Sequence, residues 1–297
     1  PASRRCGPDM GWNQKYWDLI DQLYWTPGYM GLQSINRREW RLEGDRISVP
    51  ASLVNRSGPL YSRGLRIDAL VGDLHRMEEP LNQIFNLTFA LAPDALIQRM
   101  FVQSLGFSDS GPFESIGRET HVRYGWNPNE NITQHDALFV SATSAIAVEL
   151  KLGSSTWPGQ VMKYAALLAW EEMVCGPKSN LGLLFVAPER ARSSHWKKCG
   201  LSSSAIDRSF MDQSWAKPLP APIRGLMLDH RERVASVLDR LQLGFMSWPE
   251  AAARMSAFSN EISSESPGDQ TLRKLIAGFL DQLIRHEMTG YDKASAL

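Results

Sequence analysis

Apolar residues along the middle of the chain recur in two different patterns. The segments in which they recur with the spacing of a helix are residues 66–91, 94–105 and 159–174. The segments in which they alternate with polar residues, or run together as in a buried strand, are residues 119–124, 136–141, 146–152 and 181–187. Pro80 is expected to break or kink the first helix, Pro158 to begin the third and Gly106 to follow the second.

From residue 94 onward the order of these elements is helix, strand, strand, strand, helix, strand. This order predicts an α/β fold with a mixed central sheet flanked by helices. The last two strands are joined by a helix, so we expect them to run parallel. Beyond Pro188 the chain is first basic and then helical in three pieces, at residues 226–243, 248–262 and 269–288. We expect these pieces to form a C-terminal helical appendage outside the sheet.

The patterns divide the chain into an N-terminal, mostly helical or irregular region, a central core, and a basic loop with a helical C-terminal region, at residues 1–90, 91–190 and 191–297. The N-terminal region is rich in aromatic side chains, namely Trp12, Tyr16, Trp17, Tyr24, Trp25, Tyr29 and Trp40. Such rings can stack on bases. Packing in a core or at a contact with a second copy or a protein partner is the commoner role of so many tryptophans.

The composition is that of an ordinary globular protein with a sizeable core, since 43% of the 297 residues are hydrophobic and 22% are charged. The formal net charge is +0, so binding of nucleic acid would depend on a local basic strip. Cys6, Cys175 and Cys199 form no CxxC pair, which argues against disulfides and zinc and favours a reduced, cytoplasmic protein. No apolar run is long enough to predict a helix across a membrane, and residues 1–9 lack the apolar core of a signal sequence.

Candidate chemistry lies on the strand at residues 146–152. Side chains alternate along a strand, so Glu149 and Lys151 share one face with Ala147, while the opposite face is wholly apolar. A four-residue connection to the preceding strand would pair Asp136 with Lys151, and a connection two residues shorter would pair it with Glu149. Both registers put Asp136 on the same face as the other two, because a shift of two residues preserves facing.

Two carboxylates and a lysine on one patch of a sheet have a defined chemistry. Carboxylate oxygens suit Mg²⁺ or Mn²⁺, which keep several waters and take further ligands from phosphate groups. Such an ion polarises a phosphoryl oxygen and helps to generate hydroxide. Lys151 can orient the attacking water or stabilise developing charge.

Asp136 followed by Glu149-Leu150-Lys151 resembles the D…(D/E)xK signature of the PD-(D/E)XK nucleases, with His135 where that family often has proline. The predicted order of elements also resembles the shared core of the family. Gln160 and Tyr164, on the helix after the ExK strand, resemble the QxxxY motif of its RecB-like and related exonuclease branches. The resemblance covers roughly residues 90 to 190.

The resemblance implies a restriction-endonuclease-like core and a Mg²⁺-dependent (or Mn²⁺-dependent) nuclease whose partner is nucleic acid, most simply DNA. It implies that Asp136 and Glu149 hold metal with the Leu150 carbonyl, and that Lys151 serves the nucleophile. Gln160 and Tyr164 would face the site or the DNA. Many members carry a further acid on the first core helix. Residues 94–105 contain no glutamate, which leaves three candidates, Asp94, Glu114 and Glu119.

Other interpretations of the same residues stay open at this point. The chain is alternatively a catalytically inactive, nuclease-like module for DNA binding or scaffolding, or an unrelated enzyme in which Asp136 and Glu149 lie far apart. Tyr164 also belongs to an apolar helical stripe and can be a core residue. The basic residues Arg190, Arg192, His195, Lys197 and Lys198 either contact phosphates or form a solvated loop. The sequence distinguishes neither DNA from RNA nor endonuclease from exonuclease action.

Overall fold

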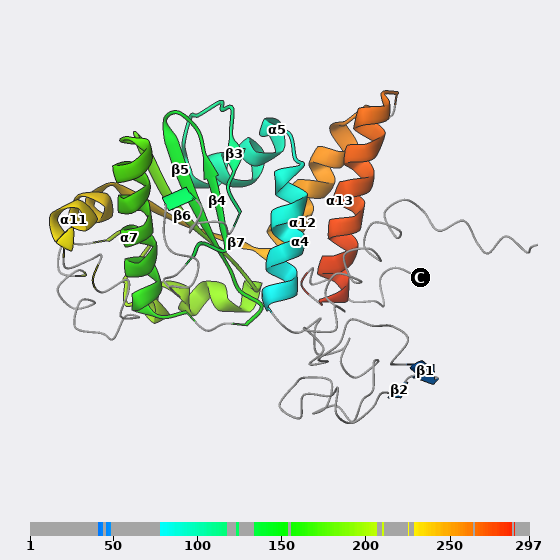
Figure 1. The fold of residues 1–297 in the computed structure, drawn as a ribbon, viewed down its shortest axis with the longest axis horizontal. Coiled ribbons are helices and arrows are strands. Elements are labelled where there is room, and N and C mark those ends of the chain that lie inside the picture. The colour runs from blue at the N-terminus through cyan, green and yellow to red at the C-terminus, as the bar shows by residue number, and fades with distance from the viewer. Residues whose placement is uncertain are drawn as a thin grey trace, which may run out of the picture.

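Five strands within the described residues form one mixed sheet, with helices on both of its faces (Figure 1). The computed structural model describes residues 41–43, 46–48, 78–117, 123–124, 134–153, 156–206, 210, 225, 229–263, 265–286 and 288. The strands, in the order in which they lie in the sheet, are β3 (Glu114–Ser115), β4 (Ala137–Val140), β5 (Ser144–Leu150), β6 (Asn180–Ala187) and β7 (Leu241–Ser247). The prediction of an α/β fold with a mixed sheet is confirmed.

The strand directions agree with the predicted connections. β4 runs antiparallel to β3 and to β5, whereas β6 runs parallel to β5 and to β7. The helix α7 (Pro158–Cys175) joins the parallel pair β5 and β6, as its pattern and Pro158 predicted. A separate antiparallel pair consists of β1 (Arg41–Glu43) and β2 (Arg46–Ser48).

The connection between β4 and β5 is the shorter of the two alternatives. Val140 pairs with Ala145, and the N–H of Ser141 donates to the carbonyl of Ser144 at 2.9 Å, which leaves a tight turn. Ala137 pairs with Val148, so the next position along each strand sets Asp136 opposite Glu149.

Asp109 fixes this turn with its carboxylate. One of its oxygens accepts hydrogen bonds from the hydroxyls of Ser141, Thr143 and Ser144, and the other accepts from the N–H of Gly111. Burial alone would raise the pKa of Asp109, but the hydrogen bonds outweigh it and lower the pKa to about 2. The register that faces Asp136 toward Glu149 is therefore held from the far end of the hairpin.

Two layers of helices enclose the sheet. Figure 1 shows α7 and α11 (Arg231–Arg240) over one face, and α4 (Glu78–Ala90), α12 (Trp248–Glu261) and α13 (Pro267–Arg285) over the other. The core beneath α7 includes the buried side chains of Leu138, Ala147, Tyr164, Leu183 and Leu243. The core beneath α4, α12 and α13 includes Phe85, Phe89, Phe101, Phe139, Phe279 and Trp248.

The predicted helix at residues 94–105 is present but changes its winding. It begins as α5 (Asp94–Ile97), continues as a π-helical segment (Gln98–Val102) and ends in a 3-10 turn (Gln103–Leu105). Gly106 follows with φ 71°, a left-handed conformation that favours glycine. The predicted end of this helix is confirmed.

The expectation that the C-terminal part lies outside the sheet is wrong. The helix predicted at residues 226–243 ends at Arg240, and Leu241–Ser247 forms β7, which pairs with β6. The physical reason is alternation: Leu241 and Leu243 pack under α7, whereas Met246 packs in the opposite core. α12 and α13 complete that second core, so they are no appendage.

Other predictions meet the edges of the described residues. The strand predicted at residues 119–124 lies mostly outside them, and its two described residues, Arg123 and Tyr124, are helical. The sheet begins instead with β3. Pro80 lies in the first turn of α4 and does not kink it, while residues 66–77 and the aromatic residues up to Trp40 lie outside the described residues. Among the helices that are described, none is long and apolar enough to cross a membrane.

The place of β7 in the sheet can be tested at Gly244. A Cβ atom there would lie 2.8 Å from Cδ1 of Leu184 and 2.9 Å from Cδ2 of Leu105, both in the core. We expect Gly244→Val to lower the free energy of unfolding by about 1–3 kcal/mol, because a packed core resists extra volume. Chemical denaturation measures the change.

Gly268→Ala is the control, since a Cβ atom at Gly268 has no neighbour closer than 3.9 Å. We expect its effect to stay within about 0.5 kcal/mol. Equal, small effects of the two substitutions would contradict the packing of β7 against β6 and Leu105.

Candidate metal and catalytic site

The predicted site residues gather at one end of the sheet. Parallel strands β5, β6 and β7 end there, antiparallel β4 begins there, and α7 starts there. The carboxyl ends of parallel strands are the usual place for a site in an α/β fold. Five predicted side chains meet at this end, namely Asp136, Glu149, Lys151, Gln160 and Tyr164.

The carboxylate of Glu149 lies at the centre of the cluster and is only 2% exposed. Lys151 Nζ lies 2.8 Å from its Oε1, and the Gln160 side-chain amide donates to the same oxygen. The Tyr164 hydroxyl donates to Oε2, and Lys163 Nζ lies 3.6 Å from this same oxygen. A buried carboxylate needs such partners, because an uncompensated charge in a core is very costly.

Asp136 lies beside Glu149 and is held by the backbone of β5. The N–H of Leu150 donates to its Oδ2 at 2.9 Å. Its own N–H donates to the Tyr164 hydroxyl at 3.2 Å, and its carbonyl accepts from Asn86 Nδ2 at 2.7 Å. The alternative of an unrelated enzyme, in which Asp136 and Glu149 would lie far apart, is therefore wrong in its prediction for these two residues.

The two carboxyl groups differ in their readiness to ionise. Burial, and then the charge of Glu149, raise the pKa of Asp136 to about 7. Burial would also raise the pKa of Glu149, but the ammonium groups of Lys163 and Lys151 outweigh it and lower that pKa below its ordinary value. Of the two groups, Asp136 is therefore the one that takes up a proton as the pH falls through about 7.

This donor set fits a divalent cation of the Mg²⁺ type. Mg²⁺ keeps several waters and needs one or two carboxylates from the protein. Asp136 and Glu149 supply two, and a divalent charge would let both ionise. The described part of the chain contains no group of three His, Cys, Asp or Glu side chains that could hold a metal.

No candidate for a third acid joins the pair within the described residues. Asp94 accepts a hydrogen bond from the N–H of Phe113 at 2.9 Å. Glu114 pairs with Val140 at the opposite end of β4 and lies 3.4 Å from Arg123. Glu119 lies outside the described residues.

Lys163 is a site residue that the motif comparison missed. It occupies the position before Tyr164 in the QxxxY segment, and its Nζ lies 4.4 Å from the centre of the Tyr164 ring. Its position three residues after Gln160 places the two on neighbouring parts of the helix surface, and this spacing was the available signal. The site therefore carries two lysines, each near one oxygen of Glu149.

His135, the residue before Asp136, packs behind the site. Its ring centre is 5.5 Å from that of Tyr164, and its Nε2 lies 3.1 Å from the Tyr124 hydroxyl. Burial lowers the pKa of His135 to about 3, so the ring is neutral. This neutral ring supports the position of Tyr164. Tyr164 is thus both a core residue and a hydrogen-bond partner of Glu149.

The basic stretch after β6 is helical. It forms a 3-10 helix (Glu189–Ser194) and α8 (His195–Lys198). Arg192 pairs with Glu189 at 2.7 Å and with Glu250 at 3.0 Å, whereas Arg190 is exposed. His195 is buried against Phe185, and burial lowers its pKa to about 4.

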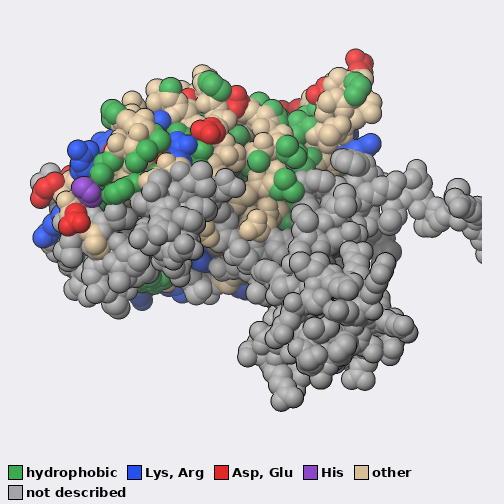
Figure 2. Space-filling model, in the orientation of Figure 1, with side chains coloured by type: hydrophobic (Ala, Val, Ile, Leu, Met, Phe, Trp, Pro, Cys, Tyr) green, Lys and Arg blue, Asp and Glu red, His purple; other side chains and the backbone are tan. Residues whose placement is uncertain are grey.

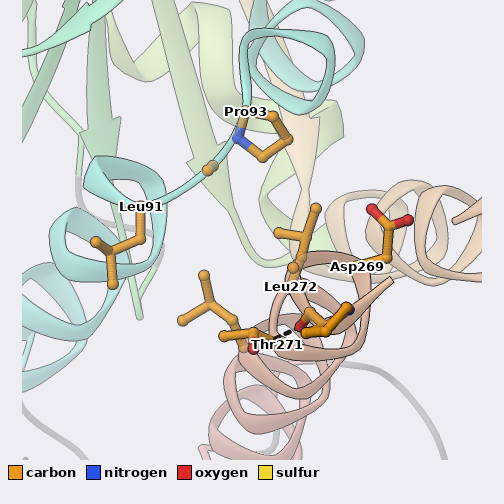
Figure 3. A pocket seen from close by; sticks show the side chains of 9 residues that line it. Leu91, Pro93, Asp269, Thr271 and Leu272 are labelled. Atoms are coloured by element: carbon orange, nitrogen blue, oxygen red, sulfur yellow. Dashed lines mark hydrogen bonds between the residues drawn. The ribbon is translucent and has the colours of Figure 1, made fainter. Parts of the chain in front are cut away.

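A cavity of about 680 Å³ lies elsewhere, between the α4–α5 connection and the start of α13 (Figure 3). Leu91, Pro93 and Leu272 give it an apolar lining, and Asp269 is its only charged residue. It lies on the α4 side of the sheet, away from α7 and Glu149. This cavity therefore contributes no side chain to the carboxylate pair.

Comparisons of the chain with family models, with curated proteins and with solved structures give no match. The arrangement itself defines the kind of site: an acidic pair flanked by two lysines at the carboxyl edge of a mixed sheet.

The proton on Asp136 predicts how stability depends on pH in the presence of a metal chelator. The folded state holds this proton more tightly than the unfolded chain does, so the contribution of Asp136 to wild-type stability is lost as pH rises from 3.8 to about 7. Asp136→Asn removes the titrating group. Above that pH we expect the variant to be more stable than the wild type by on the order of 1–3 kcal/mol.

The advantage should vanish below the ordinary aspartate pKa of 3.8, where Asp136 is protonated in both states. Denaturant titrations across this pH range measure it, with Asp281→Asn on the exposed face of α13 as the control. A difference between Asp136→Asn and wild type that does not change with pH would contradict a raised Asp136 pKa.

Proposed function

We propose that this protein is a metal-dependent nuclease of the PD-(D/E)XK type that hydrolyses phosphodiester bonds, most simply in DNA. The observation that carries the proposal is the convergence of Asp136, Glu149 and Lys151 on one face, where β4 begins and β5 ends. The arrangement of α5, the β3–β5 strands, α7 and parallel β6 supports a restriction-endonuclease-like core.

Asp136 and Glu149, with the main-chain carbonyl of Leu150, would hold Mg²⁺ or Mn²⁺. When bound, such an ion polarises the phosphoryl oxygen. It also lowers the pKa of a bound water, so that hydroxide is available near neutral pH. Lys151 Nζ, 2.8 Å from Glu149 Oε1, is placed beside this carboxylate to orient the attacking water or to stabilise charge on the phosphate.

Gln160 and Tyr164 act as positioning residues for Glu149. Both come from the first turns of α7 and donate hydrogen bonds to different oxygens of its carboxylate. The Tyr164 hydroxyl also accepts from the N–H of Asp136, so one side chain spans both acids. Such support matters because small displacements of a catalytic group are costly in rate.

The protein has no basic excess overall, so phosphate contacts would depend on individual cations near the site. Lys151 and Lys163 lie at the carboxylate pair, and the exposed Arg190 and Lys197 follow β6 at the same end of the sheet. On the face seen in Figure 2, charges of both signs are interspersed over the end of the molecule that carries α7 and α11. These four cations are the candidates for phosphate contacts.

A second function is favoured by one specific observation. Both oxygens of Glu149 already accept hydrogen bonds from the protein, from Gln160 and Tyr164, and Lys151 lies against one of them. A carboxylate satisfied in this way also suits an inactive, nuclease-like module that binds DNA or serves as a scaffold. The two functions differ in their dependence on metal.

The nuclease is tested by cleavage of linear, circular and single-stranded DNA with Mg²⁺, with Mn²⁺ and with EDTA. We expect metal-dependent cutting that falls by at least about 100-fold in Glu149→Gln and in Lys151→Ala, because each removes a charged group from the reacting centre. Lys274→Ala, at an exposed position of α13, serves as the matched control for loss of a lysine.

Cutting of circles would assign endonuclease action, and cutting restricted to ends would assign exonuclease action. Equal rates in wild type and Lys151→Ala would refute the assignment of the site. DNA binding by the wild type without cutting under any of these conditions would favour the inactive module.

A further inference from the structure

Trp157 is an exposed aromatic residue directly before α7, the helix that supplies Gln160 and Tyr164 to the candidate site. Its side chain is 40% exposed, although tryptophan is usually well buried. The large hydrophobic side chains that are exposed in the described part of the chain are Leu91, Trp157, Val174 and Ile284. Only Trp157 among these stands immediately before the first turn of α7, next to the side chains that bind Glu149.

Two consecutive hydrogen bonds connect Trp157 to the carboxylate. The N–H of Trp157 donates to Gln160 Oε1 at 3.3 Å, and the other end of the same amide donates to Glu149. The carbonyl of Trp157 also accepts from the N–H of Gln160 at 3.0 Å. The backbone that carries the indole is therefore fixed relative to the reacting centre.

Gly159 gives the indole its place. A Cβ atom at Gly159 would lie 1.8 Å from Cζ3 and 2.0 Å from Cη2 of Trp157, so the ring rests against the backbone of the helix. Any side chain at Gly159 would have to push the ring away. One part of the indole is thus supported by α7, and the exposed remainder is available to a ligand.

We propose that Trp157 is a stacking platform for an unpaired nucleobase beside the scissile phosphate, so that the site takes single-stranded or frayed nucleic acid. This inference rests on the proposed nuclease function. Aromatic side chains bind single strands through stacking, which every base permits because every base has a π-face. Bases inside a duplex are covered by their neighbours and reach such a ring only after leaving the stack.

The charges around the platform fit the same ligand. Lys163, about 9 Å further along α7 by helix geometry, faces Glu149 and carries a cation for the backbone phosphate. Gln160 links the backbone of Trp157 to the same carboxylate that Lys151 and Lys163 flank, so in our proposal the phosphate contacts the lysines and the base turns toward the indole. Trp157 therefore selects the form of the strand, and the carboxylate pair acts on its phosphate.

Binding of labelled oligonucleotides by the full chain in EDTA tests the platform without cleavage. Fluorescence anisotropy gives the Kd for a single strand and for the matching duplex. We expect Trp157→Ala to weaken single-strand binding by about 5- to 100-fold. Duplex binding, which depends on phosphate contacts, should change by less than about 2-fold. Trp157→Phe, which keeps a ring, should retain most of the affinity.

Gly159→Ala tests the same contact while leaving the indole in the chain. The new methyl group must displace the ring, and alanine is a better helix former than glycine, so α7 is not weakened. We expect a loss of single-strand affinity similar to that of Trp157→Ala. Leu91→Ala, an exposed hydrophobic residue near α5, is the control and should bind like the wild type.

An abasic site moved along the single strand locates the stacked base. At one position it should weaken binding by the wild type but not by Trp157→Ala, because the partner of the missing base is already absent. An unchanged single-strand Kd in Trp157→Ala, or an equal loss for duplex, would overturn the platform and leave the nuclease proposal intact. Absence of any nucleic-acid binding by the wild type would overturn both.

Discussion

Burial of the Glu149 carboxylate is the constraint on which the rest of the site depends. A charge so far removed from water persists only with strong partners, and here they come from two elements. Lys151 comes directly after the last residue of β5, whereas Gln160 and Tyr164 reach Glu149 from α7. The carboxylate therefore fixes the start of α7 against the end of the sheet. It also fixes the backbone of Trp157, whose main-chain N–H donates to Gln160 Oε1.

The hairpin of β4 and β5 adds the second acid to this arrangement. Its tight turn, held by Asp109 at one end, sets Asp136 opposite Glu149 at the other. Burial and the neighbouring charge of Glu149 together raise the pKa of Asp136 to about 7, so Asp136 ionises less readily than an ordinary aspartate. A divalent cation removes the conflict between the two charges. The same geometry thus accounts for the raised pKa and for the affinity for metal that we propose.

Local patterns were sufficient to predict the centre of the fold but not its C-terminal part. Alternation along residues 146–152 put Glu149 and Lys151 on one face, and parity added Asp136 without knowledge of the register. The choice between two registers depended on Asp109, about thirty residues away, and could not be made locally. β7 was missed because a short apolar run after a helix reads equally as its continuation. Its strand conformation depends on packing of Gly244 against Leu184 and Leu105, which are far apart in sequence.

We propose that Asp136 and Glu149 share one divalent ion, which takes the place of a protein partner at Glu149. Anomalous diffraction from crystals of the protein soaked in Mn²⁺ measures this directly, because manganese is located independently of the surrounding atoms. We expect an anomalous peak in contact with both carboxylates and within reach of the Leu150 carbonyl, with Lys151 turned away from Glu149 Oε1. A map without manganese at this pair, with Lys151 and Tyr164 still bound to Glu149, would contradict it.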